Sequence, residues 1–196
     1  MDLAIDLGCN VVTTHIGVIP AQAADRRYLV LAKACEALGR YGESAGATFA
    51  IETGPEPAAA LRAFLDDLSI PRGLGGNFDP ANLVMVINED IPAAVQALAP
   101  YIVHTHAKDG RNLKPVGAEV LYGAFAEGGI EGFHASEYIR EEPLGQGDVN
   151  FKTYLPALRG AGYDGYLTIE REVGQNPRRD IEAAVAFLRE QLAELK

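Results

Sequence analysis

The stretch Tyr101–Lys108, YIVHTHAK, gives the most direct indication of the fold. Side chains alternate between the two faces of a β-strand, so His104, His106 and Lys108 share one face of it. Other short apolar runs also end on a side chain that can bind a metal. These runs are Asn10–His15 (NVVTTH), Thr48–Glu52 (TFAIE), Gly73–Asp79 (GLGGNFD) and Gly165–Glu170 (GYLTIE).

These five runs predict five parallel strands whose terminal side chains meet at one rim. Segments with helical spacing separate most of them, at about 26–42, 57–68, 91–99 and 151–161, and a further helix is expected at 177–195. Alternating strands and helices predict an α/β fold with a parallel sheet, whose chemistry lies at the C-terminal rim. A closed barrel of eight βα units has roughly 250 residues, so this chain is short of it by about three units.

The chain length of 196 residues suits one domain, which we place at 1–196. Within it, the segment at about 110–143 is the exception to the pattern. It contains several glycines and aromatic residues and has no clear hydrophobic period. A connection of this length inside a domain is usually functional or mobile. Four glutamates near the predicted rim or in this segment are expected to be solvated: Glu56, Glu137, Glu141 and Glu142.

The composition excludes several classes of partner. The net charge is −10 and the sequence pI is about 4.8, which argues against binding to nucleic acid. The sequence has no apolar run of membrane-spanning length and no basic amphipathic helix, so no membrane partner is expected. Two cysteines without a CxxC motif fit a reducing compartment, and we expect a cytoplasmic protein.

Four of the terminal side chains form a candidate metal site: Glu52, Asp79, His106 and Glu170. Three carboxylates and one imidazole suit a hard or borderline divalent cation. Each residue also has a structural interpretation. His106 or His104 could be a packed histidine, the glutamates could pair with Lys108 or Arg171, and Asp79 could start a turn.

An ordered set of motifs then indicates a family. IETG (51–54), NFDPANL (77–83), HTHAKDG (104–110), PLGQGDVNF (143–151) and GYDGYLTIERE (162–172) resemble the sugar phosphate isomerase/epimerase group with the xylose isomerase-like TIM barrel. The resemblance implies the C-terminal five-eighths of such a barrel, N-terminally incomplete. It implies one divalent ion (Mn²⁺, Mg²⁺, Co²⁺ or Zn²⁺) held by Glu52, Asp79, His106 and Glu170, with Glu52 and Glu170 as the catalytic carboxylates that exchange a proton.

Six further residues are candidates for binding a small carbohydrate: His15, Asn82, His104, Lys108, Gly145 and Gly147. His15 matches a rim histidine of the family, although a packed histidine fits it equally well. Asn82 stands where many relatives have a histidine, and this departure argues against the three-metal nuclease branch. The two glycines let backbone N–H groups approach an oxyanion or a hydroxyl, although a tight turn explains them as well.

The resemblance implies an isomerase or epimerase that acts on a sugar, polyol or cyclitol through an enediolate. An alternative with the same first step is a lyase, a dehydratase or an enzyme that cleaves 3-keto-glycosides. A second alternative is a truncated, inactive binding or scaffold protein, because the first and last strands would have unpaired edges. Completion by a homo-oligomer or by a missing N-terminal segment stays open at this point.

Overall fold

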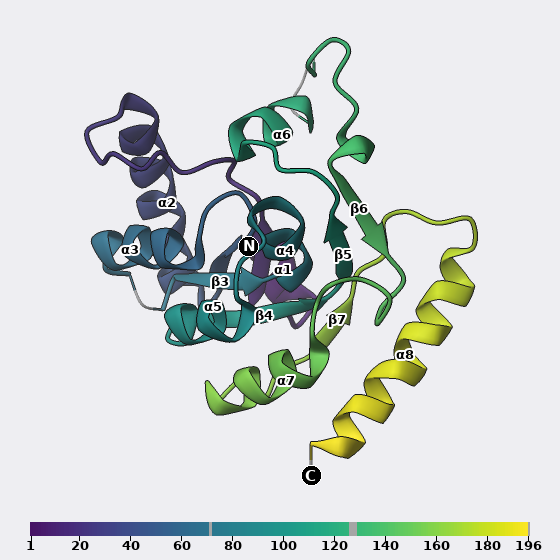
Figure 1. Cartoon of the computed structure of the whole chain (residues 1–196). Helices are drawn as coiled ribbons and strands as arrows, with labels where there is room; N and C mark the ends of the chain where they lie inside the picture. Colours follow the sequence, from purple (N-terminus) through teal and green to yellow (C-terminus); the bar gives the residue numbers. More distant parts are fainter. Residues whose placement is uncertain (71, 126–128, 196) are drawn as a thin grey trace.

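The computed structural model describes residues 1–70, 72–125 and 129–195. The predicted domain of 1–196 and the segment 110–143 also include residues 71, 126–128 and 196, which lie outside the described residues. Five parallel strands form one sheet in the order β1-β2-β3-β4-β7 (Figure 1). Their bounds are β1 Val11–Thr14, β2 Thr48–Glu52, β3 Leu74–Phe78, β4 Ile102–Ala107 and β7 Leu167–Ile169.

Helices follow most of these strands, as a parallel sheet requires. Their bounds are α1 Asp2–Asp6, α2 Arg26–Ala45, α3 Ala58–Leu68, α4 Pro80–Ile87, α5 Ile91–Leu98, α6 Ala118–Phe125, α7 Phe151–Gly160 and α8 Pro177–Glu194. Several helices begin where a side-chain oxygen accepts a backbone N–H of the first turn, which satisfies an otherwise unpaired donor. The capping residues are Asp25, Asp79, Asp90, Asn150 and Asn176.

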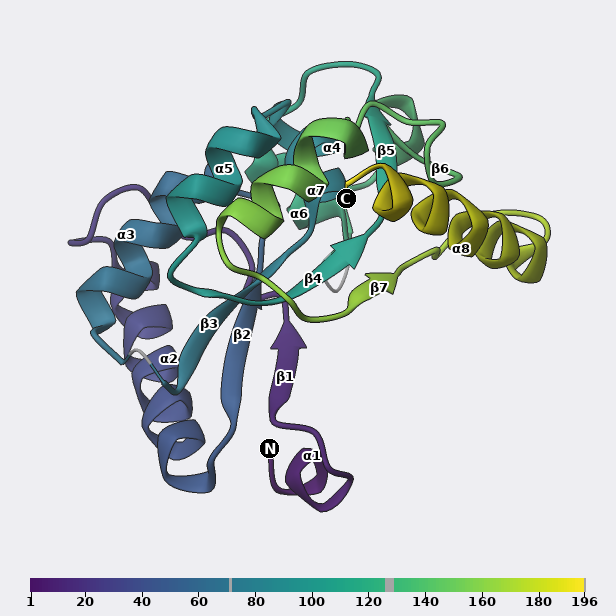
Figure 2. The ribbon, with the colours of Figure 1, turned by 90° about the horizontal axis from the view of Figure 1, so that it is seen from below.

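The hydrophobic core lies between the middle strands and the helices that cover one face of the sheet. Helix α3 contacts α5, and α5 contacts α7, so the three form a continuous layer (Figure 2). Leu61, Phe64 and Leu65 of α3 and Val95 of α5 are at most 1% exposed. Full burial of such a side chain contributes about 1.5–3 kcal/mol, which makes this layer the main support of the rim above it.

A separate two-stranded antiparallel sheet lies within the segment that the sequence leaves without a clear period. Strand β5 (Asp109–Asn112) pairs with β6 (Ile139–Glu142), and Asp109 lies opposite Glu142. Helix α6 and the short 3₁₀ helix η1 (Ala135–Glu137) lie between these strands in the chain. Helix α4 follows β3 and packs against both β5 and β6, so the two-stranded sheet is held at the rim of the main sheet.

The predicted α/β class and the five parallel strands are confirmed. Except for β2, the strands are shorter than the quoted apolar runs, so several predicted rim residues follow a strand directly and do not lie in it. Strands β1 and β7 form the two edges of the main sheet, which therefore has the form of an incomplete barrel. Among the described residues, no helix combines the length and the apolarity that a membrane crossing requires.

Candidate metal centre and adjoining cavity

The four residues predicted as metal ligands come together at the C-terminal rim of the sheet. Glu52 ends β2, His106 lies near the end of β4, and Asp79 and Glu170 directly follow β3 and β7. Each offers one ligand atom, and these atoms all lie within 4.8 Å of one another. The parallel register explains this convergence, because it aligns the C-terminal ends of neighbouring strands at one rim.

The imidazole of His106 lies at the centre of this cluster. Its Nδ1 atom is 3.1 Å from Asp79 Oδ2, 3.2 Å from Glu170 Oε2 and 3.6 Å from Glu52 Oε1. Its Nε2 atom is 3.2 Å from the side-chain nitrogen of Asn77, which also donates to Glu52 Oε2 at 3.1 Å. The Asn77 side chain lies against the Nε2 side of the ring, and the Nδ1 atom faces the three carboxylates.

The cluster holds opposite charges close together, and the pKa values reflect this. Burial opposes a charge on His106, but Asp79, Glu170 and Glu52 outweigh it and raise its pKa to about 11. Burial would raise the pKa of Glu170, yet contacts with His106 and Lys108 lower it to about 2. The pKa of Glu52 is also well below its usual range, because His106 and His15 outweigh its burial. Burial dominates at Asp79 and raises its pKa.

A divalent cation fits this group of atoms. Glu170 Oε2 is buried and makes no hydrogen bond of acceptable geometry, although Lys108 Nζ and His106 Nδ1 lie 2.8 and 3.2 Å away. A buried carboxylate oxygen with free acceptor capacity is what a cation ligand requires. Three carboxylates and one neutral imidazole are a donor set for Mn²⁺, Mg²⁺, Co²⁺ or Zn²⁺.

Asp79 both caps a helix and belongs to the candidate metal cluster. One carboxylate oxygen, Oδ1, accepts the backbone N–H of Asn82 at 2.9 Å and caps α4. The other oxygen, Oδ2, faces His106. The hydroxyl of Thr53 accepts the backbone N–H of Asp79 at 2.8 Å and donates to its carbonyl oxygen at 3.0 Å. Helix capping therefore fixes the orientation of this candidate ligand.

Lys108 lies beside the cluster and pairs with Glu170. This is one of the ion pairs that the sequence offered as an alternative to metal binding. Its ammonium is 2.8 Å from both Glu170 and Glu172 and 3.8 Å from Glu141. Burial would lower the pKa of Lys108, but Asp79 and Glu170 outweigh it and raise that pKa above its usual range. Asp109, the alternative partner, accepts only backbone N–H groups among the described hydrogen bonds.

Glu141 is buried, so the expectation that it is solvated is wrong. Its side chain is 7% exposed and contacts Arg171 at 2.7 Å. It also accepts the backbone N–H groups of Glu172 at 3.1 Å and Val173 at 3.4 Å. This one carboxylate on β6 therefore fixes the segment that directly follows Glu170.

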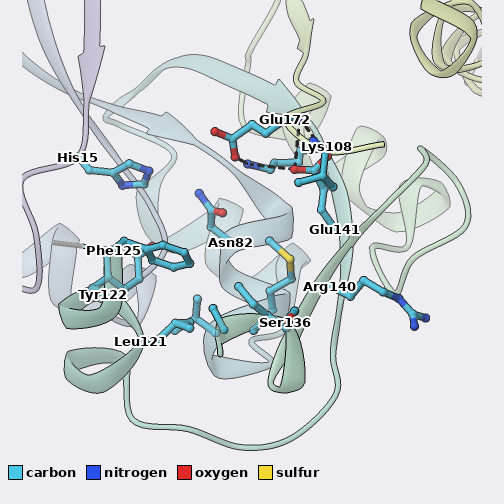
Figure 3. A pocket seen from close by; sticks show the side chains of 15 residues that line it. His15, Asn82, Lys108, Leu121, Tyr122, Phe125, Ser136, Arg140, Glu141 and Glu172 are labelled. Carbon is cyan, nitrogen blue, oxygen red and sulfur yellow. Dashed lines mark hydrogen bonds and ion pairs between the residues drawn. The ribbon is translucent and has the colours of Figure 1, made fainter. Parts of the chain in front are cut away.

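A cavity of about 800 Å³ adjoins the cluster (Figure 3). His15, Asn82 and Lys108 line it, and each of them also contacts a cluster carboxylate. His15 Nε2 is 3.3 Å from Glu52 Oε1, and the Asn82 side-chain nitrogen donates to the same oxygen at 3.0 Å. The hydrogen bond with Glu52 raises the pKa of His15. Three predicted substrate-binding residues thus lie between the cluster and the cavity.

The other predicted substrate-binding residues lie elsewhere. His104 packs its ring against His106, 5.8 Å between centroids, and is not among the described residues that line the cavity. The backbone N–H groups of Gly145 and Gly147 donate to Asp109 Oδ2, each at 2.9 Å. These amides bind a carboxylate of the chain itself, which gives them a structural role in place of the predicted contact with substrate.

Three residues near the site were not among the predicted site residues. Asn77 precedes Asp79 by two residues, so strand alternation was the signal that could have found it. Glu56 was expected to be solvated but is 6% exposed, and burial raises its pKa to about 7. Tyr122 on α6 packs its ring edgewise on His15, and its hydroxyl occupies the space that a Cβ atom on Gly54 would need.

The comparisons with known proteins agree with this architecture. The family of xylose isomerase-like TIM barrels matches residues 1–191. The chain therefore belongs to the xylose isomerase-like TIM barrel family. No curated protein matches the chain.

Three solved structures illustrate the likeness. A xylose isomerase domain protein from Planctomyces limnophilus is 29% identical, with a TM-score of 0.76, and the match covers 97% of this chain and 60% of that one. A xylose isomerase-like TIM barrel protein from Mycobacterium smegmatis, in complex with magnesium, is 17% identical, with a TM-score of 0.70 and coverages of 100% and 65%. A D-tagatose 3-epimerase-like protein is 20% identical, with a TM-score of 0.68 and coverages of 97% and 64%.

The two likenesses of 17% and 20% identity show the fold alone. The chain spans less than two thirds of the length of all three structures. The matched part includes the whole rim described above, because the family match runs from residue 1 to residue 191.

Proposed function

We propose that this chain carries the metal-binding and proton-transfer half of an isomerase or epimerase for small polyhydroxylated carbonyl compounds. One observation carries the proposal. The ligand atoms of Glu52, Asp79, His106 and Glu170 lie within 4.8 Å of one another beside a cavity. A divalent cation bound there would polarise a substrate carbonyl as a Lewis acid and stabilise the negative charge that develops on its oxygen.

Two carboxylates in this arrangement can exchange a proton with a carbon next to a carbonyl. The pKa values of Glu52 and Glu170 are both lowered, so both groups are ionised at neutral pH. One carboxylate removes the α-proton, which leaves an enediolate and a protonated carboxyl group. That carboxyl group returns its proton, or the other carboxylate takes a proton from water and delivers it to the opposite face of the enediolate. Return to the opposite face of the same carbon gives epimerisation, and return to the neighbouring carbon, with transfer of a proton between the two oxygens, gives 1,2-isomerisation.

The remaining polar groups at the cavity orient these carboxylates. Asn82 and His15 both contact Glu52 Oε1 from the cavity side. Lys108 holds a positive charge 2.8 Å from Glu170, where it can also stabilise a substrate oxygen. These three side chains are therefore proposed as substrate contacts, and Glu52 and Glu170 as the catalytic pair.

The experiment uses a panel of ketopentoses and ketohexoses with the chain and Mn²⁺ in deuterated water. We expect deuterium at the carbon next to the ketone, detected by NMR. Glu52→Gln and Glu170→Gln should each lower the exchange rate by about 10²–10⁴-fold, because each removes a proton-transfer group. Glu182→Gln is the matched control, since Glu182 is an exposed glutamate on α8 that pairs only with Arg178 in the described contacts.

Each result has a defined meaning. Exchange at the wild-type rate in both variants would refute the proton-transfer roles. Failure of the wild-type chain to bind Mn²⁺ in a calorimetric titration would refute the metal centre. A new alkene or a released aglycone among the products would assign the lyase chemistry in place of the isomerase chemistry.

A further inference from the structure

The cavity beside the candidate metal centre has two chemically different sides. One side consists of the polar groups already described. The other side is apolar and comes largely from α4 and α6: Met85, Val86, Leu121, Tyr122 and Phe125. Figure 3 shows Leu121, Tyr122 and Phe125 together on one side, and Lys108 and Glu172 on the opposite side. We call this five-residue set the apolar wall.

The apolar wall is more than the outer surface of the core. Phe125 is 64% exposed, although a phenyl ring in contact with water loses the benefit of burial. Leu121 of the same helix is fully buried and α6 contacts α4, so Phe125 belongs to a helix that packs against the rest of the chain. An exposed aromatic ring on a fixed helix at the edge of a cavity is typical of a ligand contact.

The size of the cavity also favours a ligand larger than a single sugar ring. A volume of about 800 Å³ lies in the upper part of the range for sites that hold drug-sized ligands. A single sugar ring fills only part of such a space. Its hydroxyl groups would be satisfied at the polar side, where His15, Asn82 and Lys108 lie, but not at the apolar wall, where they would lose hydrogen bonds to water.

We propose that the natural substrate is a carbonyl sugar or cyclitol that bears an aryl substituent, with the substituent seated on the apolar wall. This inference rests on the proposed function, because it places the carbonyl end of the substrate at Glu52 and Glu170. The aryl group stacks on Phe125 and packs against Tyr122, both of which line the cavity. The polyol end reaches Asn82 and Lys108.

The test compares 3-keto-glucose with its phenyl β-glycoside, in which a phenyl group replaces the hydrogen of the anomeric hydroxyl. We expect the phenyl compound to bind at least tenfold more tightly in a calorimetric titration with Mn²⁺ present, and to exchange its α-proton with a correspondingly higher kcat/KM. Phe125→Ala should lower this preference by a factor of about five to ten, which is the usual contribution of an aromatic contact to affinity. The preference is the ratio of the affinities for the two compounds, both measured with the same variant.

Tyr166→Ala is the matched control, because Tyr166 is an aromatic residue that is 84% exposed and does not line this cavity. Equal binding of the two compounds by the wild-type chain would overturn the inference, whatever the exchange rates are. Retention of the full preference in Phe125→Ala would overturn it as well. Tight binding of the phenyl glycoside without proton exchange would instead contradict the proposed function and support the apolar wall.

Discussion

Glu56 is a buried acid that makes few contacts. It lies in the connection between β2 and α3, and one of its carboxylate oxygens accepts the backbone N–H of Ile19 at 3.4 Å. Burial raises its pKa from 4.5 to about 7, because this single long hydrogen bond only partly replaces the lost hydration. The folded chain therefore takes up a proton at Glu56 more readily than the unfolded chain does.

This shift predicts how stability depends on pH. The contribution of Glu56 to the free energy of unfolding is complete below pH 4.5 and is lost as the pH rises through about 7. Glu56→Gln keeps an acceptor for Ile19 and carries no charge. We expect it to raise the free energy of unfolding at pH 8 by about 2–3 kcal/mol, with little effect at pH 4.

Urea denaturation of wild type and Glu56→Gln at both pH values measures this difference. Glu182→Gln, an exchange of an exposed glutamate on α8, serves as the control and should change neither value by more than about 0.5 kcal/mol. An equal gain in stability at pH 4 and pH 8 would show that the proton equilibrium of Glu56 is not the cause.

Sequence reasoning found the residues that depend on strand order and missed those that depend on contacts across the chain. Glu52, Asp79, His106 and Glu170 could be predicted because parallel strands align their ends. The burial of Glu141 could not, because it depends on Arg171 and on backbone groups about thirty residues away in the sequence. Glu56 likewise becomes buried only when the β1–α2 connection covers it.

The connection between β6 and α7 shows how one side chain can fix a whole element. Asp109, the first residue of β5, accepts four backbone N–H groups. The donors are those of Gly110, Gly145, Gly147 and Val149, at 2.9–3.1 Å. At Gly147 a Cβ atom would collide with the Asp109 carboxylate, which accounts for a glycine there. The ribbon of β5 and β6 is thereby tied to the start of α7.

We expect Asp109→Ala to release this connection. Several backbone donors would lose their acceptor together, at about 1–3 kcal/mol for each donor that stays buried. The free energy of unfolding should fall by about 3 kcal/mol. Hydrogen exchange at the amides of 145, 147 and 149 should accelerate well before global unfolding.

Asp148→Ala is the comparison variant, because Asp148 lies in the same connection but is 44% exposed and pairs with Arg111 at the surface. Its loss should cost less than about 1 kcal/mol. Equal destabilisation by both substitutions would show that the Asp109 hydrogen bonds are not what holds this connection.

At the level of elements, long helices and buried strands could be predicted, and the segment between β5 and β6 could not. Helices α2 and α8 show regular spacing because each presents one face to the rest of the chain. Strands β5 and β6 have only four residues each, and their exposure does not alternate cleanly. Their pairing depends on α4, which packs against both of them. A local sequence pattern does not indicate such a contact.

The main sheet as a whole is open. Strand β1 pairs only with β2, and β7 pairs only with β4, among the strands that the structure describes. Two residues of β1, Thr13 and Thr14, are exposed, and large apolar side chains such as Leu3 and Leu7 lie in water nearby in the sequence. An unpaired edge next to exposed apolar groups is a surface that favours association.

We therefore expect the isolated chain to associate with itself as its concentration rises. Thr13→Lys places a charge on the open edge and should raise the midpoint concentration of association by roughly tenfold. Thr153→Lys adds the same charge at an exposed position on α7, outside β1, and should have little effect. Sedimentation velocity over a range of concentrations measures this. A wild-type chain that stays monomeric throughout would contradict the prediction.

Helix α6 belongs to the excursion between β5 and β6, whereas the candidate ligands belong to the main sheet. The aromatic residues that would contact the aryl substituent and the carboxylates that would transform the substrate are thus carried by different stretches of polypeptide. A graft of residues 113–138 from one relative into another could then exchange substrate preference and leave the chemistry intact. The segment between β5 and β6 would then be a unit that evolution can exchange without changing the residues that carry out the reaction.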